Sequence, residues 1–283
     1  MRLNVRVPSL LRVSAAALLL SNAIPARADL TEVNIFDNTI YEQTGSAAPT
    51  SPSLFFFSFG GNSVAAGDFT GGNLTSPNAT LTSLPVSGTS FGASSLLFTT
   101  FAGLHTQFPF GSYTITGTGG TDGPQSETFS YPLDAFTTDI PALDPSAFIG
   151  LQGLNPTNSL TIGFNSFSPD SHANEAFTFF TIFDAGTVVF TEAFLSNSTT
   201  SVFLPANKLL PGTSYSFELD FSDRIRSLDG ATGVTIDQGF DVRTEGSFTT
   251  GSAAVPEPTS LVLFGTAAGL LALLRRRSLA KRS

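Results

Sequence analysis

A strict alternation of apolar and polar residues runs through Tyr215-Ser216-Phe217-Glu218-Leu219-Asp220-Phe221-Ser222. Successive side chains of a β-strand point to opposite faces, so this pattern predicts a strand with one buried face. Leu160-Thr161-Ile162-Gly163-Phe164-Asn165 alternates in the same way. Further strands are expected at 54–59, 94–101, 109–116, 176–183, 186–194, 201–204 and 239–250, with a hairpin turn at Asp184-Ala185-Gly186. No convincing amphipathic helix stands between the two ends, and the pattern therefore predicts an all-β, antiparallel β-sandwich.

A turn-like segment, Leu210-Pro211-Gly212-Thr213-Ser214-Tyr215, leads into the alternating stretch. It resembles the corner of fibronectin type III and related immunoglobulin-like folds, where the tyrosine opens a core strand and its hydroxyl bonds back to nearby backbone. Pro109 and Tyr113 repeat the spacing of Pro211 and Tyr215. The resemblance implies an immunoglobulin-like region at 124–250, behind a β-rich region at 29–123 and a glycine-rich boundary at 118–123. Two immunoglobulin-like modules and one large jelly-roll-like sandwich are the alternative arrangements.

The distribution of charge excludes one class of partner. The formal net charge of the whole chain is −9. Between Asp29 and Val255 there are 21 acidic and 4 basic residues, so this part carries −17. Nucleic-acid binding requires a basic surface and is not expected. The chain contains no cysteine, which excludes disulfides and thiolate metal sites.

The first 28 residues have the order of a secretory signal peptide. Arginines come first, an apolar run follows at 13–20, and Ala26-Arg27-Ala28 supplies a small-residue cleavage site. The apolar run is too short to span a bilayer. We therefore expect export through the Sec pathway, with signal peptidase cutting after Ala28.

The C-terminal end has three consecutive parts after a short linker at 251–255. Pro256-Glu257-Pro258 comes first, and its prolines block helix propagation from upstream. Residues 259–274 carry no charge and predict a helix of roughly 24 Å, slightly short of a bilayer core of about 30 Å. Arg275-Arg276-Arg277 then opens a basic end at 275–282, which the positive-inside rule keeps in the cytoplasm. The whole segment, 256–283, is expected to hold the precursor in the inner membrane.

This tail, together with a signal peptide, closely resembles the PEP-CTERM sorting signal. The resemblance covers roughly the last 29 residues and rests on Pro256, Glu257 and Pro258 placed directly before the helix and on Arg275–277 after it. It implies that an exosortase, a membrane-embedded cysteine protease-transpeptidase, recognises the tripeptide and cleaves near it. It also implies a mature protein at the cell surface or in an extracellular matrix, with exopolysaccharide as a candidate partner. A permanent single-span anchor is the alternative role of the tail.

Signals for chemistry are weak in the sequence. Gly88-Thr89-Ser90-Phe91-Gly92 matches the nucleophile-elbow pattern, but an expected strand follows it instead of the helix that this motif requires. Its histidine partner would be His172. Calcium is a second alternative, through Asp220, Asp223, Asp229, Asp237 and Asp241, although no EF-hand spacing is present.

The expected function is therefore non-enzymatic, with no catalytic residue, metal ligand or cofactor assigned. A secreted polysaccharide or ester hydrolase and a calcium-dependent adhesive module are the alternatives. The chain has no Trp and only 4 Tyr, which weighs against a sugar-stacking platform. Its 28 Phe are expected to fill the core.

Overall fold

A computed structural model describes residues 30–78, 81–119, 123–131 and 135–252. These residues form three β-sheets and two short helices, α1 (Phe101–Gln107) and α2 (Pro145–Leu151). No helix within the described part of the chain is long and apolar enough to cross a membrane. The predicted signal peptide at 1–28 and the predicted helix at 259–274 lie outside the described residues.

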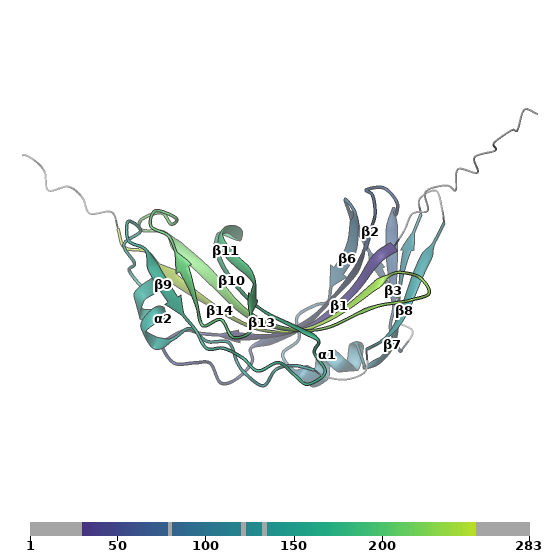
Figure 1. Cartoon of the computed structure of the whole chain (residues 1–283), viewed down its shortest axis with the longest axis horizontal. Helices are drawn as coiled ribbons and strands as arrows, with labels where there is room; N and C mark the ends of the chain where they lie inside the picture. Colours follow the sequence, from purple (N-terminus) through teal and green to yellow (C-terminus); the bar gives the residue numbers. More distant parts are fainter. Residues whose placement is uncertain (1–29, 79–80, 120–122, 132–134, 253–283) are drawn as a thin grey trace, which may run out of the picture.

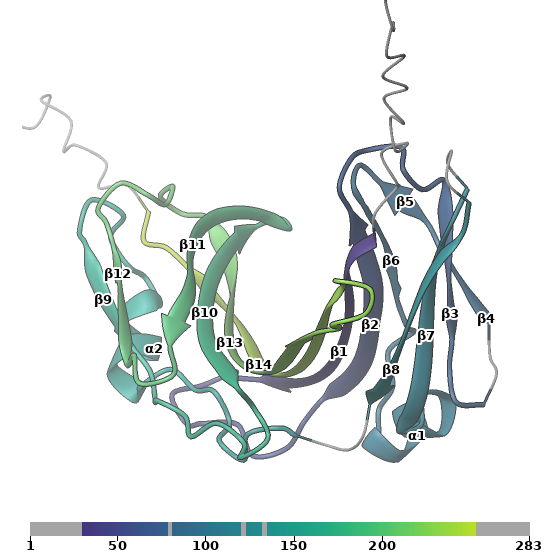
Figure 2. The same ribbon diagram turned by 45° about the vertical axis from the view of Figure 1, so that its right-hand side comes forward.

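The largest sheet has eight strands in the order β11-β10-β13-β14-β1-β2-β6-β5. All neighbours pair antiparallel except β1 and β14, which run parallel from Glu32 opposite Thr235 to Glu42 opposite Glu245. The sheet curves into a trough that is open on one side (Figures 1 and 2). Its strands are β1 (Leu30–Glu42), β2 (Leu54–Ser63), β5 (Val86–Ser87), β6 (Ser90–Ser94), β10 (Glu175–Asp184), β11 (Thr187–Ser196), β13 (Ser214–Leu228) and β14 (Thr235–Thr249).

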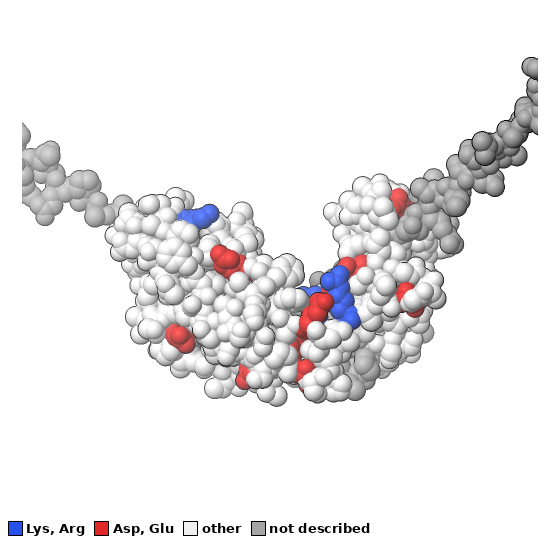
Figure 3. Space-filling view, viewed as in Figure 1, with Lys and Arg blue, Asp and Glu red and all other residues white. Residues whose placement is uncertain are grey.

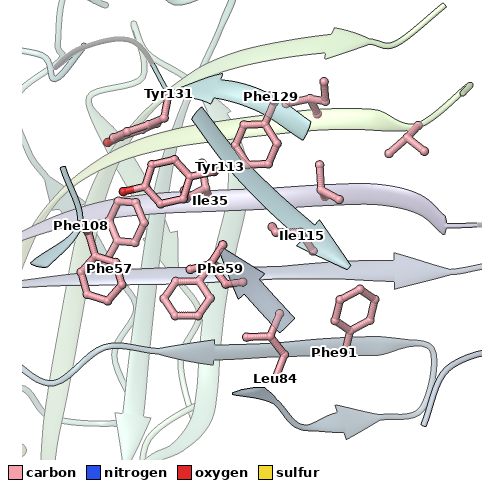
Figure 4. Close-up of a cluster of buried hydrophobic side chains, with 14 of the residues drawn as sticks. Ile35, Phe57, Phe59, Leu84, Phe91, Phe108, Tyr113, Ile115, Phe129 and Tyr131 are labelled. Atoms are coloured by element: carbon pink, nitrogen blue, oxygen red, sulfur yellow. The ribbon is translucent and has the colours of Figure 1, made fainter. Parts of the chain in front are cut away.

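A first lobe covers the outside of one arm of the trough. It consists of a four-stranded sheet in the order β4-β3-β7-β8, together with α1. Aromatic rings fill the space between the sheets (Figure 4). The ring of Phe57 stacks on Phe108 at 5.0 Å and meets Tyr131 edge-on at 5.6 Å. The strands are β3 (Gly71–Thr75), β4 (Leu81–Leu84), β7 (Gly111–Thr118) and β8 (Gln125–Tyr131).

A second lobe covers the outside of the opposite arm. The two-stranded sheet of β9 (Leu160–Gly163) and β12 (Ser201–Leu204) packs there with α2. Their apolar side chains meet the core face of β10 and β13, where Phe180 and Phe217 are completely buried. Each lobe is thus a β-sandwich whose second layer is one arm of the shared sheet (Figure 2). The predicted β-sandwich is confirmed at this level.

Two long strands, β13 and β14, take part in both cores. In β13, Phe217 belongs to the core of the second lobe, while Ile225 packs against that of the first. In β14, Phe240 belongs to the core of the first lobe and Phe248 to the core of the second. The predicted boundary near residue 123 stays a prediction. The two strands beside it, β7 and β8, pair with each other from Gly111 opposite Tyr131 to Gly117 opposite Gln125.

The local predictions are confirmed where a turn or a tyrosine corner directly precedes a strand. Ala185 and Gly186 both have positive φ, 45° and 84°, as the two-residue turn between β10 and β11 requires. The hydroxyl of Tyr215 accepts a 2.7 Å hydrogen bond from the Leu210 backbone amide. The hydroxyl of Tyr113 donates one of 2.8 Å to the Pro109 carbonyl. Both tyrosines therefore bond back to the turn that precedes their strands, as predicted.

The strand predicted at 94–101 is wrong. β6 ends at Ser94, a single bridge joins Phe98 to Phe55, and α1 starts at Phe101. Thr100 caps this helix by accepting from the Gly103 amide at 3.1 Å. Leu96 and Leu97 are 83% and 60% exposed, so the apolar residues that suggested a strand do not enter the core. Both helices have only seven residues, too few to show a helical period in the sequence.

Candidate functional site

The inner side of the trough is the candidate functional site, and we call it the hollow face. It is formed by the residues of β10, β13, β14, β1, β2 and β6 whose side chains alternate with those of the two cores. The space-filling view shows the hollow between the two lobes, with acidic and basic side chains gathered on its wall (Figure 3).

Strand register arranges the hollow face in rows of residues that lie side by side. One row crosses from Thr181 through Glu218 and Glu245 to Glu42. The next row contains Phe179, Asp220, Arg243, Ile40 and Leu54. The two rows beyond that are Phe177, Ser222, Asp241, Asn38 and Phe56, followed by Glu175, Arg224, Gly239, Phe36 and Ser58. Aromatic, acidic and basic side chains therefore stand next to one another on a rigid sheet.

Arg224 contacts three neighbouring side chains in the middle of the hollow face. Its Nη1 donates to Asp237 Oδ2 at 3.1 Å, and its Nε donates to Ser222 Oγ at 2.6 Å. The guanidinium also lies 4.2 Å from the centre of the Phe36 ring, a cation–π contact. The ring has room because Gly239 stands beneath it. A Cβ at that position would come within 2.0 Å of the ring.

Arg243 holds the second group of charges. Its Nη1 lies 3.5 Å from Glu218 and 3.9 Å from Glu245, and its Nε lies 3.9 Å from Asp220, beyond hydrogen-bond distance. Burial, reinforced by the carboxylate of Asp241, raises the pKa of Asp220 well above its usual value. Burial and the nearby Glu218 raise the pKa of Glu245 as well.

Asp220 and Asp241 are diagonal neighbours on β13 and β14, since Asp220 pairs with Arg243 and Asp241 with Ser222. Burial raises the pKa of Asp241, while Arg224 and a 2.5 Å hydrogen bond from Ser222 oppose the rise. Within the described residues, Asp220 Oδ1 and Asp237 Oδ1 are buried without a hydrogen-bond partner. The surface thus has unused acceptor atoms in addition to its ion pairs.

Three phenylalanines form an aromatic patch at one side of the hollow face. Phe194 of β11 meets Phe177 and Phe179 of β10 edge-on, with ring centres 5.4 Å and 5.0 Å apart. Phe194 is 69% exposed and has a positive φ of 54°. The expectation that phenylalanines serve the core is therefore wrong for this patch.

A groove of about 710 Å³ continues the hollow face toward the second lobe. Ile40, Glu42 and Glu245 line it from the sheet, and Phe148 and Gln152 of the α2 region line it from the other side. Its size lies within the range of pockets that hold small ligands or a segment of a polymer.

The residues weighed for hydrolysis are not brought together. Ser90 is the first residue of β6, after a two-residue turn in which Gly88 has a φ of 64°, and its hydroxyl donates to Asn62 Oδ1 at 2.7 Å. His172 precedes β10 and contacts Asp170, with 2.7 Å between Nδ1 and Oδ1. The nucleophile-elbow match is therefore a β-hairpin.

The aspartates weighed for calcium divide between two faces. Asp220, Asp237 and Asp241 lie on the hollow face, Asp223 points to the opposite side, and Asp229 lies in the β13–β14 loop. Among the described residues, no three His, Asp or Glu side chains are grouped as metal ligands. The predicted processing residues lie outside the described residues, and their roles stay predictions: Ala26, Ala28, Pro256, Glu257, Pro258, Arg275, Arg276 and Arg277.

The arrangement of the hollow face was not found from the sequence. The 215–222 alternation predicted that Glu218, Asp220 and Ser222 share an open face, and β13 confirms it. The partners from β1 and β2 are about 200 residues away in sequence and left no local signal.

Comparison with known proteins identifies the tail. No curated protein sequence matches the chain. Among solved structures, the BSP domain of a biofilm-associated protein is 16% identical with a TM-score of 0.21; the match covers 78% of this chain and 30% of that one. The FN1–FN3 domains of chicken CNTN1 are 11% identical with a TM-score of 0.24, covering 81% and 69%. These scores are too low to bear on fold or function.

The family model for the PEP-CTERM protein-sorting motif matches residues 254–278. The match includes Pro256, Glu257, Pro258 and the arginines at 275–277, the residues on which the resemblance rested. The chain therefore carries a PEP-CTERM sorting motif, which indicates an exported, cell-surface protein.

Proposed function

We propose that the chain is an exported, non-enzymatic surface or matrix protein that an exosortase releases from its C-terminal membrane tether. In this proposal the signal peptide directs export through the Sec pathway. The helix at 259–274 then holds the precursor in the inner membrane until the tail is cut near Pro256-Glu257-Pro258. The mature protein acts by binding.

The observation that carries the proposal is the position of the motif relative to the fold. The last described backbone bonds join Gly251 to Leu154 and to Gly212, each at 2.9 Å. The motif starts at residue 254. A cut at the tripeptide therefore removes no strand of the three sheets and no residue of the two cores.

The N-terminal end of the fold supports the same proposal. β1 starts at Leu30, whose amide donates to Gln125 Oε1 at 2.8 Å. Cleavage after Ala28 would leave one residue before the first strand. Both proposed cuts thus border the folded region without entering it.

The test is the intact mass of the protein from its native host. We expect a chain that starts at Asp29 and ends near Pro256-Glu257-Pro258. Replacing these three residues with alanine should leave an uncut precursor in the membrane fraction. Ser252→Ala, just before the matched motif, is the control and should be processed normally. A released protein that still contains residues 261–274 would contradict the proposal.

Hydrolysis is the second candidate function, and one observation favours it. Asp220 and Asp241 are diagonal neighbours on the hollow face, and burial raises the pKa of both, a feature that acid–base sites share with structural ion-pair networks. The two functions differ in the fate of a bound sugar chain, which a hydrolase would shorten and a binding protein would leave intact.

A further inference from the structure

We propose that the hollow face binds an extended glycan chain that carries free amino groups. This inference rests on the proposed function only in taking the protein to act by binding. It follows from three observations on the hollow face: a strained, exposed aromatic patch, an excess of carboxyl groups, and accessible carboxylate acceptors.

The first observation is the conformation of Phe194. A bulge in β11 places residues 193 and 194 opposite Phe179, and the chain holds Phe194 at a φ of 54°. Positive φ is unfavourable for a bulky residue, by about 1–3 kcal/mol. The ring remains 69% exposed, so its burial in the core does not offset this strain. A ligand that covers the ring would offset the cost of this backbone conformation. The apolar face of a sugar can pack against such a patch of aromatic rings.

The second observation is the charge of the hollow face. Three guanidinium groups, of Arg224, Arg226 and Arg243, stand against eight carboxyl groups. The arginines pair with some of these carboxyl groups and leave the others in excess. Even without Asp220, whose pKa burial raises well above its usual value, seven carboxyl groups outnumber the three guanidinium groups, so anionic polymers are disfavoured and a cationic chain is attracted. The carboxyl groups belong to Glu32, Glu42, Glu175, Glu218, Asp220, Asp237, Asp241 and Glu245.

The third observation concerns hydrogen bonding. Ionised carboxylates accept hydrogen bonds and donate none. The side chains of Glu218 and Glu245 are 30% and 42% exposed, so their carboxylate oxygens are accessible from the hollow. Hydroxyl and ammonium groups of an amino sugar are donors that such acceptors can use, while its ring C–H groups meet the phenylalanines.

Strand addition by a second copy of the chain fits this region less well. β11 is an edge strand, but its pairing with β10 is interrupted twice, at Thr178/Phe180 and at Ile182/Phe183. Bulges on an edge strand obstruct further pairing. The aromatic patch also faces the hollow rather than extending the plane of the sheet. An occupant of the hollow therefore fits better than a partner at the edge.

The experiment is calorimetric titration of residues 29–255, which contain both cores and all three sheets, with three hexasaccharides. A glucosamine hexamer should bind, an N-acetylglucosamine hexamer should bind about tenfold more weakly, and a galacturonate hexamer should not bind. Added salt should weaken the first interaction. A cooperative thermal transition of the fragment verifies its fold beforehand.

Two substitutions test the two parts of the surface. Phe194→Gly should weaken binding of the glucosamine hexamer about tenfold and leave the melting temperature unchanged or higher, because glycine relieves the positive φ. Phe203→Ala, at a phenylalanine on β12 that is 58% exposed, is the control and should bind normally. Glu42→Gln should weaken binding, while Asp184→Asn, at the β10–β11 turn, should not.

Several results would overturn the inference. Absence of glucosamine-hexamer binding, equal binding of the galacturonate hexamer, or normal binding by Phe194→Gly each contradict it. Equal binding of a lysine hexapeptide, insensitive to Phe194→Gly, would assign the hollow face to basic peptides instead. Shortened hexamers, detected by mass spectrometry after the titration, would assign it to hydrolysis. None of these results depends on processing of the tail, so the sorting proposal stands or falls separately.

Discussion

Asp223 shows how one buried carboxyl group can set the pH dependence of the fold. It points away from the hollow face and is completely buried. Its Oδ2 accepts from the Asp170 amide at 2.9 Å, while its Oδ1 has no partner in the described part of the chain. Burial raises its pKa to about 6, the Asp170 amide opposes the rise, and the charges of Asp170 and Asp241 add to it.

This shift predicts that stability falls as the pH rises from about 4 to about 6. In that interval the folded protein holds a proton on Asp223 that the unfolded chain has released, so the free energy of unfolding decreases with pH. Asp223→Asn removes the titrating group. We expect the variant to be more stable at pH 7 by on the order of 1–2 kcal/mol, with no advantage at pH 4. Urea unfolding at both pH values measures this, and an equal difference at both would contradict it.

At the scale of single elements, the sequence predicted many of the strands in which one residue in two enters a core, but it did not predict β1 or β8, although β8 alternates from Glu127 to Tyr131. The 215–222 alternation became part of β13, and 201–204 became β12. The turn at residues 184–186 and the tyrosines at 113 and 215 correctly indicated where strands start. The prediction failed at 94–101, where apolar residues cluster without alternating and Leu96 remains exposed. Local pattern therefore identifies strands better than it identifies short helices and loops.

The pairing of β1 with β14 depends on close packing over one glycine. The ring of Phe36 covers Gly239 on the neighbouring strand and supports Arg224. Gly239→Ala would place a methyl group within 2.0 Å of this ring, so the ring and Arg224 must move. We expect a loss of roughly 1–3 kcal/mol in the free energy of unfolding.

A double-mutant cycle isolates this contact. In a Phe36→Ala background the added methyl group meets no ring, and most of the cost of Gly239→Ala should disappear. Gly230→Ala is the control, because a Cβ added there would have no atom within 4 Å and the φ of Gly230 is not positive. Equal costs of Gly239→Ala in both backgrounds, measured by urea unfolding, would show that the ring is not the cause.

For the whole molecule, the decisive feature is that β13 and β14 belong to both lobes and that β1 pairs with β14 along their length. The sequence could not predict this, because period-2 patterns show which face of a strand is buried but not which distant strand lies beside it. The parallel partner of β1 is about 200 residues away. The hollow face is a product of that pairing, since it brings Glu42, Phe36 and Glu32 beside residues of β14. The candidate site was therefore visible only in part from the sequence.

The shared strands also predict that the two cores unfold together. Loss of either core would leave β13 and β14, which run through both lobes, packed against only one core. Phe57 lies in the first core and Phe217 in the second, and both are completely buried. Phe57→Leu and Phe217→Leu should each lower the free energy of unfolding by about 1–2 kcal/mol.

Hydrogen exchange read by mass spectrometry can follow both lobes at once. If the cores are one cooperative unit, each substitution lowers the protection of the slowest amides equally in β7 of the first lobe and in β10 of the second. If only the substituted lobe loses protection, the lobes are independent domains that merely share a sheet. The distinction matters for binding, because a ligand in the hollow contacts strands of both lobes and would stabilise both only when they are coupled.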